Sequence, residues 1–235
     1  MSDRLKLPYL SDENWLKLES SLARFGSLSE TIENQLDSPF DLGTVIAELE
    51  SSYKESGYQY LFYGLVRLLK PEKIIEIGVL QGFSLLAMAS ALKVNGRGAI
   101  KGYDLFDEYE YKNDRMTNVL SRVNSTNLHP FASLRKCDAY KVCKIERQAD
   151  ILHVDISNNG DSVGELFGQW NTRISDLIVF EGGHSDRDSI EWMRKYDKAP
   201  IHTALVRLAD LFSKDWKFIT LSPFPSITLC IKKDD

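Results

Sequence analysis

The chain has 235 residues, of which 43% are hydrophobic and 27% are charged, as is typical of one soluble globular domain with its own core. Its formal net charge of −5 disfavours general nucleic-acid binding, because duplex-binding proteins are usually basic. We see no run of about 20 apolar residues for a membrane helix, no secretory signal and no paired cysteine spacing, so we expect a cytoplasmic protein with reduced thiols.

The first 56 residues are expected to form a helical extension. Ser11 is placed to cap a helix with a continuous apolar face, and further helices are expected at 29–36 and 41–53. These helices either cover a ligand site as a lid or form the contact of a homodimer. The sequence leaves both alternatives open.

Residues 57–235 are expected to form the main domain, in which strands and helices alternate after an amphipathic helix at 58–69. The expected strands are at 73–77, 99–104, 131–135, 150–156, 176–180, 217–221 and 227–232. The last two are separated by five residues, too few for a parallel crossover, so they should pair antiparallel. The order predicts an α/β fold: a Rossmann-like open seven-stranded sheet, mostly parallel with an antiparallel last strand, and helices on both faces.

The loop after the first strand is the candidate ligand site, because ligands of such sheets bind beyond the carboxyl ends of the strands. Gly78 permits a tight turn, Gly82 lets the backbone approach a ligand, and amides of the helix that begins near Ser84 can bind a carboxylate. Glu76, if buried, needs a positive or hydrogen-donating partner, such as the ammonium group of an amino acid. The loop lacks one glycine of the G-x-G-x-x-G dinucleotide pattern, which disfavours an NAD-type oxidoreductase.

Polar residues also follow the other strands. Asp104 ends the second strand, where a carboxylate can accept both hydroxyls of a ribose, although a solvated loop acid is the alternative. Asp138, after the third strand, is a candidate partner for an adenine amino group. His153 lies inside the fourth strand and is interpreted as a core residue. His184 follows the fifth strand, and is interpreted either as a base active near neutral pH or as a helix cap.

The segment from Glu76 to Ser84 reads E-I-G-V-L-Q-G-F-S and resembles the first motif of the class I S-adenosylmethionine-dependent methyltransferases, E-x-G-x-x-x-G-x-S. The nearest branch is the small-molecule O-methyltransferases, of the catechol type or acting on sugars, and the resemblance covers about residues 58–232. It implies S-adenosylmethionine as donor, with Glu76 and Gly78 at its methionine end, beside Gly82 and Ser84. It also implies Asp104 at the ribose and Asp138 at the adenine.

The same resemblance implies that Asp155, after the fourth strand, lies nearest the transferred methyl group. In the metal-dependent branch this position binds Mg²⁺, so Asp155 and Glu181 are candidate ligands of a cation that polarises the acceptor hydroxyl. Relatives carry Asp-Gly followed by an acid and a histidine here, whereas this chain reads D-I-S-N-N-G-D from Asp155, which leaves metal dependence open. Asp155 and His184 are the candidate catalytic residues.

The predicted function is methyl transfer from S-adenosylmethionine to a hydroxyl group of a small molecule, with neither nucleic acid nor membrane as partner. One alternative is a catalytically inactive donor-binding protein that serves as a regulator or partner, which the altered segment after Asp155 favours. An NAD-type oxidoreductase is less favoured. The sequence fixes neither the acceptor nor the choice between O- and N-methylation.

Overall fold

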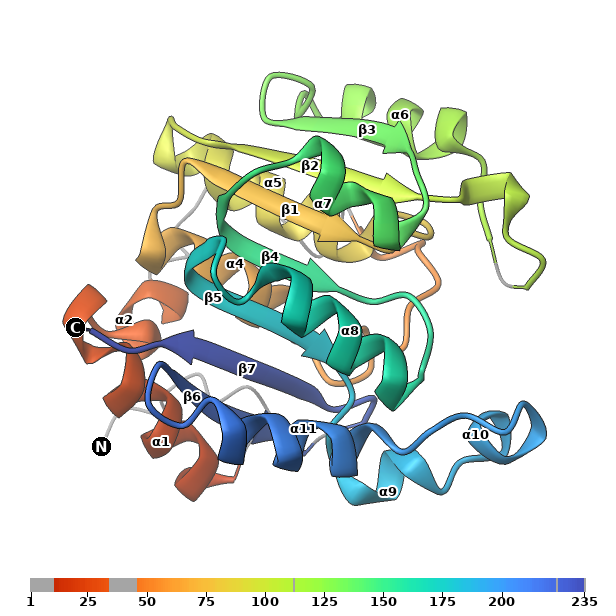
Figure 1. Ribbon diagram of the computed structural model, residues 1–235. Coiled ribbons are helices and arrows are strands. Elements are labelled where there is room, and N and C mark those ends of the chain that lie inside the picture. Colours follow the sequence, from red (N-terminus) through yellow and green to blue (C-terminus); the bar gives the residue numbers. More distant parts are fainter. Residues whose placement is uncertain (1–10, 34–45, 112, 223, 235) are drawn as a thin grey trace.

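The computed structural model describes residues 11–33, 46–111, 113–222 and 224–234, which are built around a seven-stranded sheet (Figure 1). The strands are β1 (Lys73–Ile77), β2 (Ala99–Asp104), β3 (Ala132–Lys136), β4 (Ala149–Val154), β5 (Ile174–Glu181), β6 (Trp216–Leu221) and β7 (Ile227–Lys232). Their order is β3-β2-β1-β4-β5-β7-β6. Strands β1 to β5 pair in parallel, and β7 runs antiparallel to both of its neighbours. The predicted Rossmann-like sheet with a reversed last strand is confirmed.

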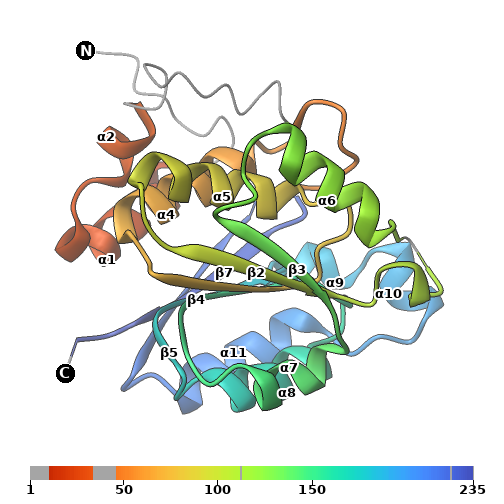
Figure 2. The ribbon, with the colours of Figure 1, turned by 90° about the horizontal axis from the view of Figure 1, so that it is seen from above.

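Helices cover both faces of the sheet (Figure 2). One face is covered by α1 (Asp12–Leu22), α2 (Leu28–Glu33), α4 (Tyr58–Leu69), α5 (Phe83–Asn95) and α6 (Met116–Ser125). The other carries α7 (Val142–Ile145), α8 (Gly160–Trp170) and α11 (Ile201–Leu211). Successive strand residues alternate between the faces: Ile74 belongs to the core under α4 and α5, and Ile75 to the core under α8. Within the described ranges, no helix has both the length and the apolar character to cross a membrane.

The remaining helices are short. They are α9 (Ser185–Asp188), α10 (Glu191–Lys195) and the 3-10 turns η1 (Ala23–Phe25), η2 (Phe106–Glu108) and η3 (Ala139–Lys141). The sequence analysis does not predict α7 and α10, because about one turn of helix is too short to show apolar periodicity. The fourth strand ends at Val154 instead of 156: Asp155 N–H still donates to Ile77 O at 2.8 Å, but β1 turns away at Gly78.

The N-terminal segment packs into the main core. Ser11 caps α1 as expected, since its Oγ accepts a hydrogen bond from Asn14 N–H at 3.3 Å. Leu18 and Leu22 of α1 are fully buried in the cluster that also holds α4 and α5. The domain boundary at residue 56 and the lid or dimer role of this segment stay predictions.

The helix expected over 41–53 is only partly within the described residues, because 41–45 lie outside them. Residues 47–57 form turns and irregular backbone instead of the end of that helix. Tyr53 N–H donates to Ser51 Oγ at 3.2 Å, a local side-chain bond of the kind that competes with helix formation. Tyr53 is only 2% exposed, so its burial against the sheet overrides the helical pattern.

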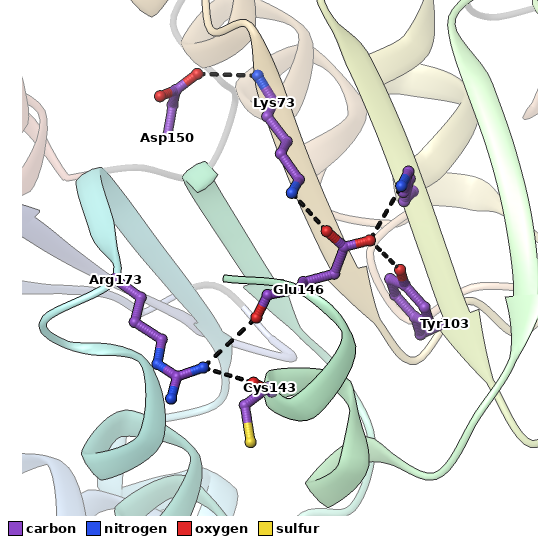
Figure 3. A network of polar contacts seen from close by, with 7 residues as sticks. Lys73, Tyr103, Cys143, Glu146, Asp150 and Arg173 are labelled. Atoms are coloured by element: carbon purple, nitrogen blue, oxygen red, sulfur yellow. Dashed lines mark hydrogen bonds and ion pairs between the residues drawn. The ribbon is translucent and has the colours of Figure 1, made fainter. Parts of the chain in front are cut away.

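A buried carboxylate ties β1 and β2 to the segment before β4 (Figure 3). Glu146 accepts hydrogen bonds from Lys73, from Lys101 at 3.0 Å and from the Tyr103 hydroxyl. Burial by itself would raise the pKa of Glu146, but the hydrogen bonds from these three residues lower it from 4.5 to about 2. The ionised form is therefore the one that stabilises the fold.

We expect Glu146→Gln to lower the free energy of unfolding at pH 7 by about 2 kcal/mol, because charge-assisted hydrogen bonds contribute about 1.5–3 kcal/mol. The folded pKa lies below the unfolded one, so this contribution is complete above pH 4.5 and is lost as the pH falls towards 2. Urea unfolding at pH 7 and pH 3 should show that wild type loses more free energy of unfolding between these two pH values than Glu146→Gln does. The exposed Glu165→Gln is the control and should behave like wild type. If Glu146→Gln and Glu165→Gln lost the same free energy between pH 7 and pH 3, this account would be contradicted.

Candidate functional site

The carboxyl ends of β1, β4 and β5 carry acidic and imidazole side chains on one face of the sheet. Glu76 is paired in register with His153 on the neighbouring strand, and Asp155 follows His153 by two residues. Glu181 ends β5, two residues after Val179, which belongs to the core on the α4 and α5 side. Because side chains alternate along a strand, all four point to this same face.

Glu76 is fully buried and only half satisfied. Its Oε1 accepts a hydrogen bond from Ser84 Oγ at the start of α5 and lies 2.9 Å from His153 Nδ1. Its Oε2 is buried and has no hydrogen-bond partner among the described residues. A buried carboxylate oxygen without a donor costs free energy that a bound cation or hydrogen-bond donor removes. The geometry thus leaves one oxygen of Glu76 for a ligand.

His153 contacts Glu76, and Tyr53 in turn contacts His153. Both are buried, and Tyr53 Oη lies 3.4 Å from His153 Nε2. Both ring nitrogens of His153 therefore have partners, in keeping with its interpretation as a core residue. Burial, followed by the nearby carboxylates of Asp155 and Glu181, raises the pKa of Tyr53 well above its usual value, so its hydroxyl stays protonated and can donate.

The loop from β1 to α5 is shaped by glycines in left-handed conformations. Gly78 has φ of 92° and Gly82 has φ of 89°, and between them Leu80 also has a positive φ of 48°. A Cβ on Gly78 would lie 1.7 Å from the backbone oxygen of Asp155. Gly82 precedes the first turn of α5, so the amides of that turn face the loop. The role of these amides in binding a carboxylate stays a prediction.

Asp104 organises this loop from the neighbouring strand. Its Oδ2 accepts hydrogen bonds from Val79 N–H at 2.6 Å and Leu80 N–H at 3.0 Å, and its Oδ1 accepts one from Phe106 N–H at 2.7 Å. A carboxylate has about four acceptor positions, so it can still accept from a ribose hydroxyl. Asp138 caps η3, where it accepts from Tyr140 N–H at 2.9 Å. The ribose role of Asp104 and the adenine role of Asp138 stay predictions.

Asp155 and Glu181 form a carboxyl pair. Asp155 and Glu181 line the same small cavity at the ends of β4 and β5. Burial, and then the charge of Glu181, raise the pKa of Asp155 well above its usual range. Glu181 Oε1 also accepts a hydrogen bond from Arg187 Nη2 at 3.0 Å, and Arg187 is only 6% exposed. The guanidinium of Arg187 thus provides a positive charge beside the two carboxyl groups.

These residues do not fit the Mg²⁺ site that the sequence analysis left open. A divalent cation of this class binds six or more oxygens, and Glu181 already directs Oε1 at Arg187. In the described parts of the chain, no cluster of three or more His, Cys, Asp or Glu side chains has a geometry that holds a metal ion. Asp155 and Glu181 lie together as predicted, but their role as Mg²⁺ ligands is not supported.

His184 caps a short helix. Its Nδ1 accepts a hydrogen bond from Asp186 N–H at 3.3 Å and lies 3.4 Å from the Asp186 carboxylate. This is the capping arrangement that the sequence analysis gave as the alternative to catalysis. A role for His184 as the base stays a prediction.

A small cavity lies between the ends of β4 and β5 and helix α8. Its volume is about 10 Å³, enough for a single water molecule. Polar side chains in its lining include Asp155, Ser157, Asn158, Ser162 and Glu181.

A family model described as a methyltransferase domain matches residues 75–192, from β1 to α10. The chain belongs to this methyltransferase family. The class I resemblance of the β1 loop and the observed strand order agree with that membership. No sequence among proteins of curated function matches this methyltransferase.

Several solved structures share the fold of this methyltransferase. An SAH-bound methyltransferase of Podospora anserina has 16% identity, with 95% of this chain and 97% of that one covered and a TM-score of 0.60. The O-methyltransferase TomG of Streptomyces achromogenes, in complex with SAM, has 16% identity, coverage of 96% and 100%, and a TM-score of 0.59. An O-methyltransferase of Bacillus cereus in complex with SAH has 13% identity, coverage of 94% and 99%, and a TM-score of 0.58. At these identities the likeness concerns the fold.

Sequence reasoning missed two residues of the site. They are Tyr53, the partner of His153, and Arg187, the partner of Glu181. The available signal was that Glu76, His153 and Glu181 occupy strand positions that face the same side of the sheet. Such a buried polar face needs hydrogen-bond partners from within the protein.

Proposed function

We propose that this methyltransferase transfers a methyl group from S-adenosylmethionine to a hydroxyl group of a small molecule. The buried Glu76 carboxylate, with Oε2 unpartnered, is the observation that carries the proposal. The methionine part of the donor bears an ammonium group, which suits Glu76 directly or through one water, and a carboxylate, which suits the amides at the start of α5. A dinucleotide offers no ammonium group for Glu76.

The nucleoside part of the donor would then lie towards β2 and β3. Asp104 would accept from the ribose hydroxyls while its other acceptor positions keep the β1 loop closed. Asp138, at the start of η3, would accept from the adenine amino group. The three solved structures named above contain SAM or SAH on the same fold, which supports this choice of donor.

The acceptor is proposed to react beside Asp155, which follows β4 and points to the same face of the sheet as Glu76. Methyl transfer from a sulfonium requires an in-line nucleophile in a site shielded from water. Burial, and then the charge of Glu181, raise the pKa of Asp155, which makes this carboxyl a stronger base than an exposed aspartate. His184 remains the second candidate base. Two of the similar structures are named O-methyltransferases, which supports a hydroxyl acceptor.

A donor-binding protein without turnover is the second candidate function. Two observations at the acceptor end favour it: Glu181 is held by Arg187, and the neighbouring cavity has room for only one water. This candidate shares the donor site and differs only at the acceptor end.

Calorimetry and turnover distinguish these candidates. We expect S-adenosylhomocysteine to bind the purified protein in titration calorimetry and NAD not to bind. Isotope-labelled S-adenosylmethionine, incubated with a panel of hydroxylated small molecules, should label at least one of them. Donor binding without any labelled product would favour the second candidate, and binding of NAD instead of S-adenosylhomocysteine would contradict both.

A further inference from the structure

The guanidinium of Arg187 is a buried positive charge at the acceptor end of the site. Arg187 lies in α9, just beyond the end of β5, and is 6% exposed. Its Nη2 donates to Glu181 Oε1 and to Asn158 Oδ1, each at 3.0 Å. Asn158 follows β4 and Glu181 ends β5, so one guanidinium joins the two strand ends that supply the acceptor side.

The arrangement around Arg187 is fixed by packing as well as by charge. The centre of its guanidinium group lies 5.0 Å from the centroid of the Phe224 ring, within the range of a cation–π contact. A planar guanidinium with a carboxylate on one side and an aromatic ring on another is held in one orientation. A buried guanidinium also needs a counter-charge, which Glu181 provides.

We propose that Arg187 takes the place of a divalent metal ion at the acceptor end of this methyltransferase. Its guanidinium joins Glu181 to Asn158 and leaves Glu181 unavailable as a ligand of an added cation. The inference rests on the proposed methyltransferase function, since it concerns how the acceptor side is organised. Arg187 is a positioning residue in this scheme, and no step of the reaction needs Mg²⁺.

The buried Nε of Arg187 has no hydrogen-bond partner among the described residues. This buried N–H is therefore not used to hold the protein together. An oxygen of the acceptor, or a water beside it, is the chemical partner that this N–H requires. A hydroxylated acceptor meets this requirement.

Manganese binding to the donor-free protein tests the proposal without reliance on turnover. Electron paramagnetic resonance with MnCl₂ should show no bound Mn²⁺ in wild type, and neither MgCl₂ nor EDTA should shift its Tm. Arg187→Met removes the donor that occupies Glu181 Oε1 and Asn158 Oδ1, so we expect it to bind Mn²⁺ at least tenfold more tightly than wild type. Arg187→Lys keeps a positive charge and should behave like wild type.

Arg194→Met is the matched control, because Arg194 is exposed on the neighbouring helix α10 and the substitution is the same. It should leave Mn²⁺ binding unchanged. If Arg187→Met does not fold, Arg187→Gln replaces it in the same assay. Equal Mn²⁺ affinity of wild type and the neutral variant, whether tight or undetectable, would overturn the proposal.

Binding of S-adenosylhomocysteine is measured on the same samples. We expect wild type and Arg187→Met to bind it within about threefold of each other, because Arg187 contacts none of the residues assigned to the donor. A wild type that binds neither Mn²⁺ nor S-adenosylhomocysteine, together with an Arg187→Met variant that gains Mn²⁺ binding, would reject the proposed function and keep the role of Arg187. A wild type that binds both would reject only the role of Arg187.

Discussion

Glu76→Gln is expected to weaken the binding of S-adenosylhomocysteine by about 30- to 1,000-fold. Loss of one partner of a buried, hydrogen-bonded charge pair costs about 2–5 kcal/mol, and we take about 2–4 kcal/mol here. Glutamine keeps the shape of the side chain and an oxygen for the bonds to Ser84 and His153. What it loses is the negative charge opposite the ammonium group of the ligand. Titration calorimetry on both proteins measures the change.

Glu72→Gln is the matched control for this experiment. Glu72 immediately precedes β1, is exposed and pairs with Arg97, so it lies at the opposite end of the strand from the ligand loop. We expect its affinity for S-adenosylhomocysteine to equal that of wild type. Equal affinities in Glu76→Gln and Glu72→Gln would mean that the buried carboxylate does not bind the donor. Circular dichroism of both variants shows whether the fold is retained.

The parts of the fold that depend on local pattern were predictable from the sequence. The bounds of β1 and β2 match the expected ranges, and β1 is a short, largely apolar run. The antiparallel pairing of β6 with β7 follows from the five residues between them, and the register Phe218 to Cys230 confirms it. The loop with Gly78 and Gly82 was recognisable because its glycines stand between a strand and a helix.

The internal partners of the site were not predictable in the same way. Tyr53 is 100 residues from His153 along the chain, and its segment has an apolar pattern that favours a helix. Only the packed structure shows that its hydroxyl turns towards the sheet. Arg187 sits between two aspartates, a composition that normally indicates a solvated turn, yet its side chain is buried and donates to Asn158 and Glu181. Long-range burial, not local propensity, decides both cases.

The role of Asp155 and Glu181 as Mg²⁺ ligands, which the sequence left open, is not supported for a related reason. The sequence indicated correctly that Asp155 and Glu181 come together at the ends of β4 and β5. It contained no information that the guanidinium of Arg187, six residues after Glu181, would donate a hydrogen bond to one of these two acids. Two acids at adjacent strand ends therefore predict proximity, but their ligand depends on which third group approaches them.

The substitution Gly78→Ala is expected to reduce the free energy of unfolding by more than about 4 kcal/mol, or to prevent folding, because it combines a steric clash with backbone strain. The added Cβ would lie 1.7 Å from Asp155 O and 3.1 Å from Ile156 Cγ2, and the φ of 92° is unfavourable for any residue with a side chain. The backbone cannot easily move away, since Gly78 N–H donates to Tyr103 O and Asp155 N–H donates to Ile77 O, each at 2.8 Å.

Gly96→Ala separates these two contributions. Gly96 ends α5 with a φ of 68°, but a Cβ there would meet no atom within 4 Å, so only the backbone strain remains, about 1 kcal/mol. Urea unfolding of both variants should therefore show a much larger loss for Gly78→Ala. A loss similar to that of Gly96→Ala would mean that the strand ends can separate, and that the close approach of β1 to Asp155 is not required. A large difference would establish that the glycine which begins the donor loop also fixes the distance between the donor side and the acceptor side of the site.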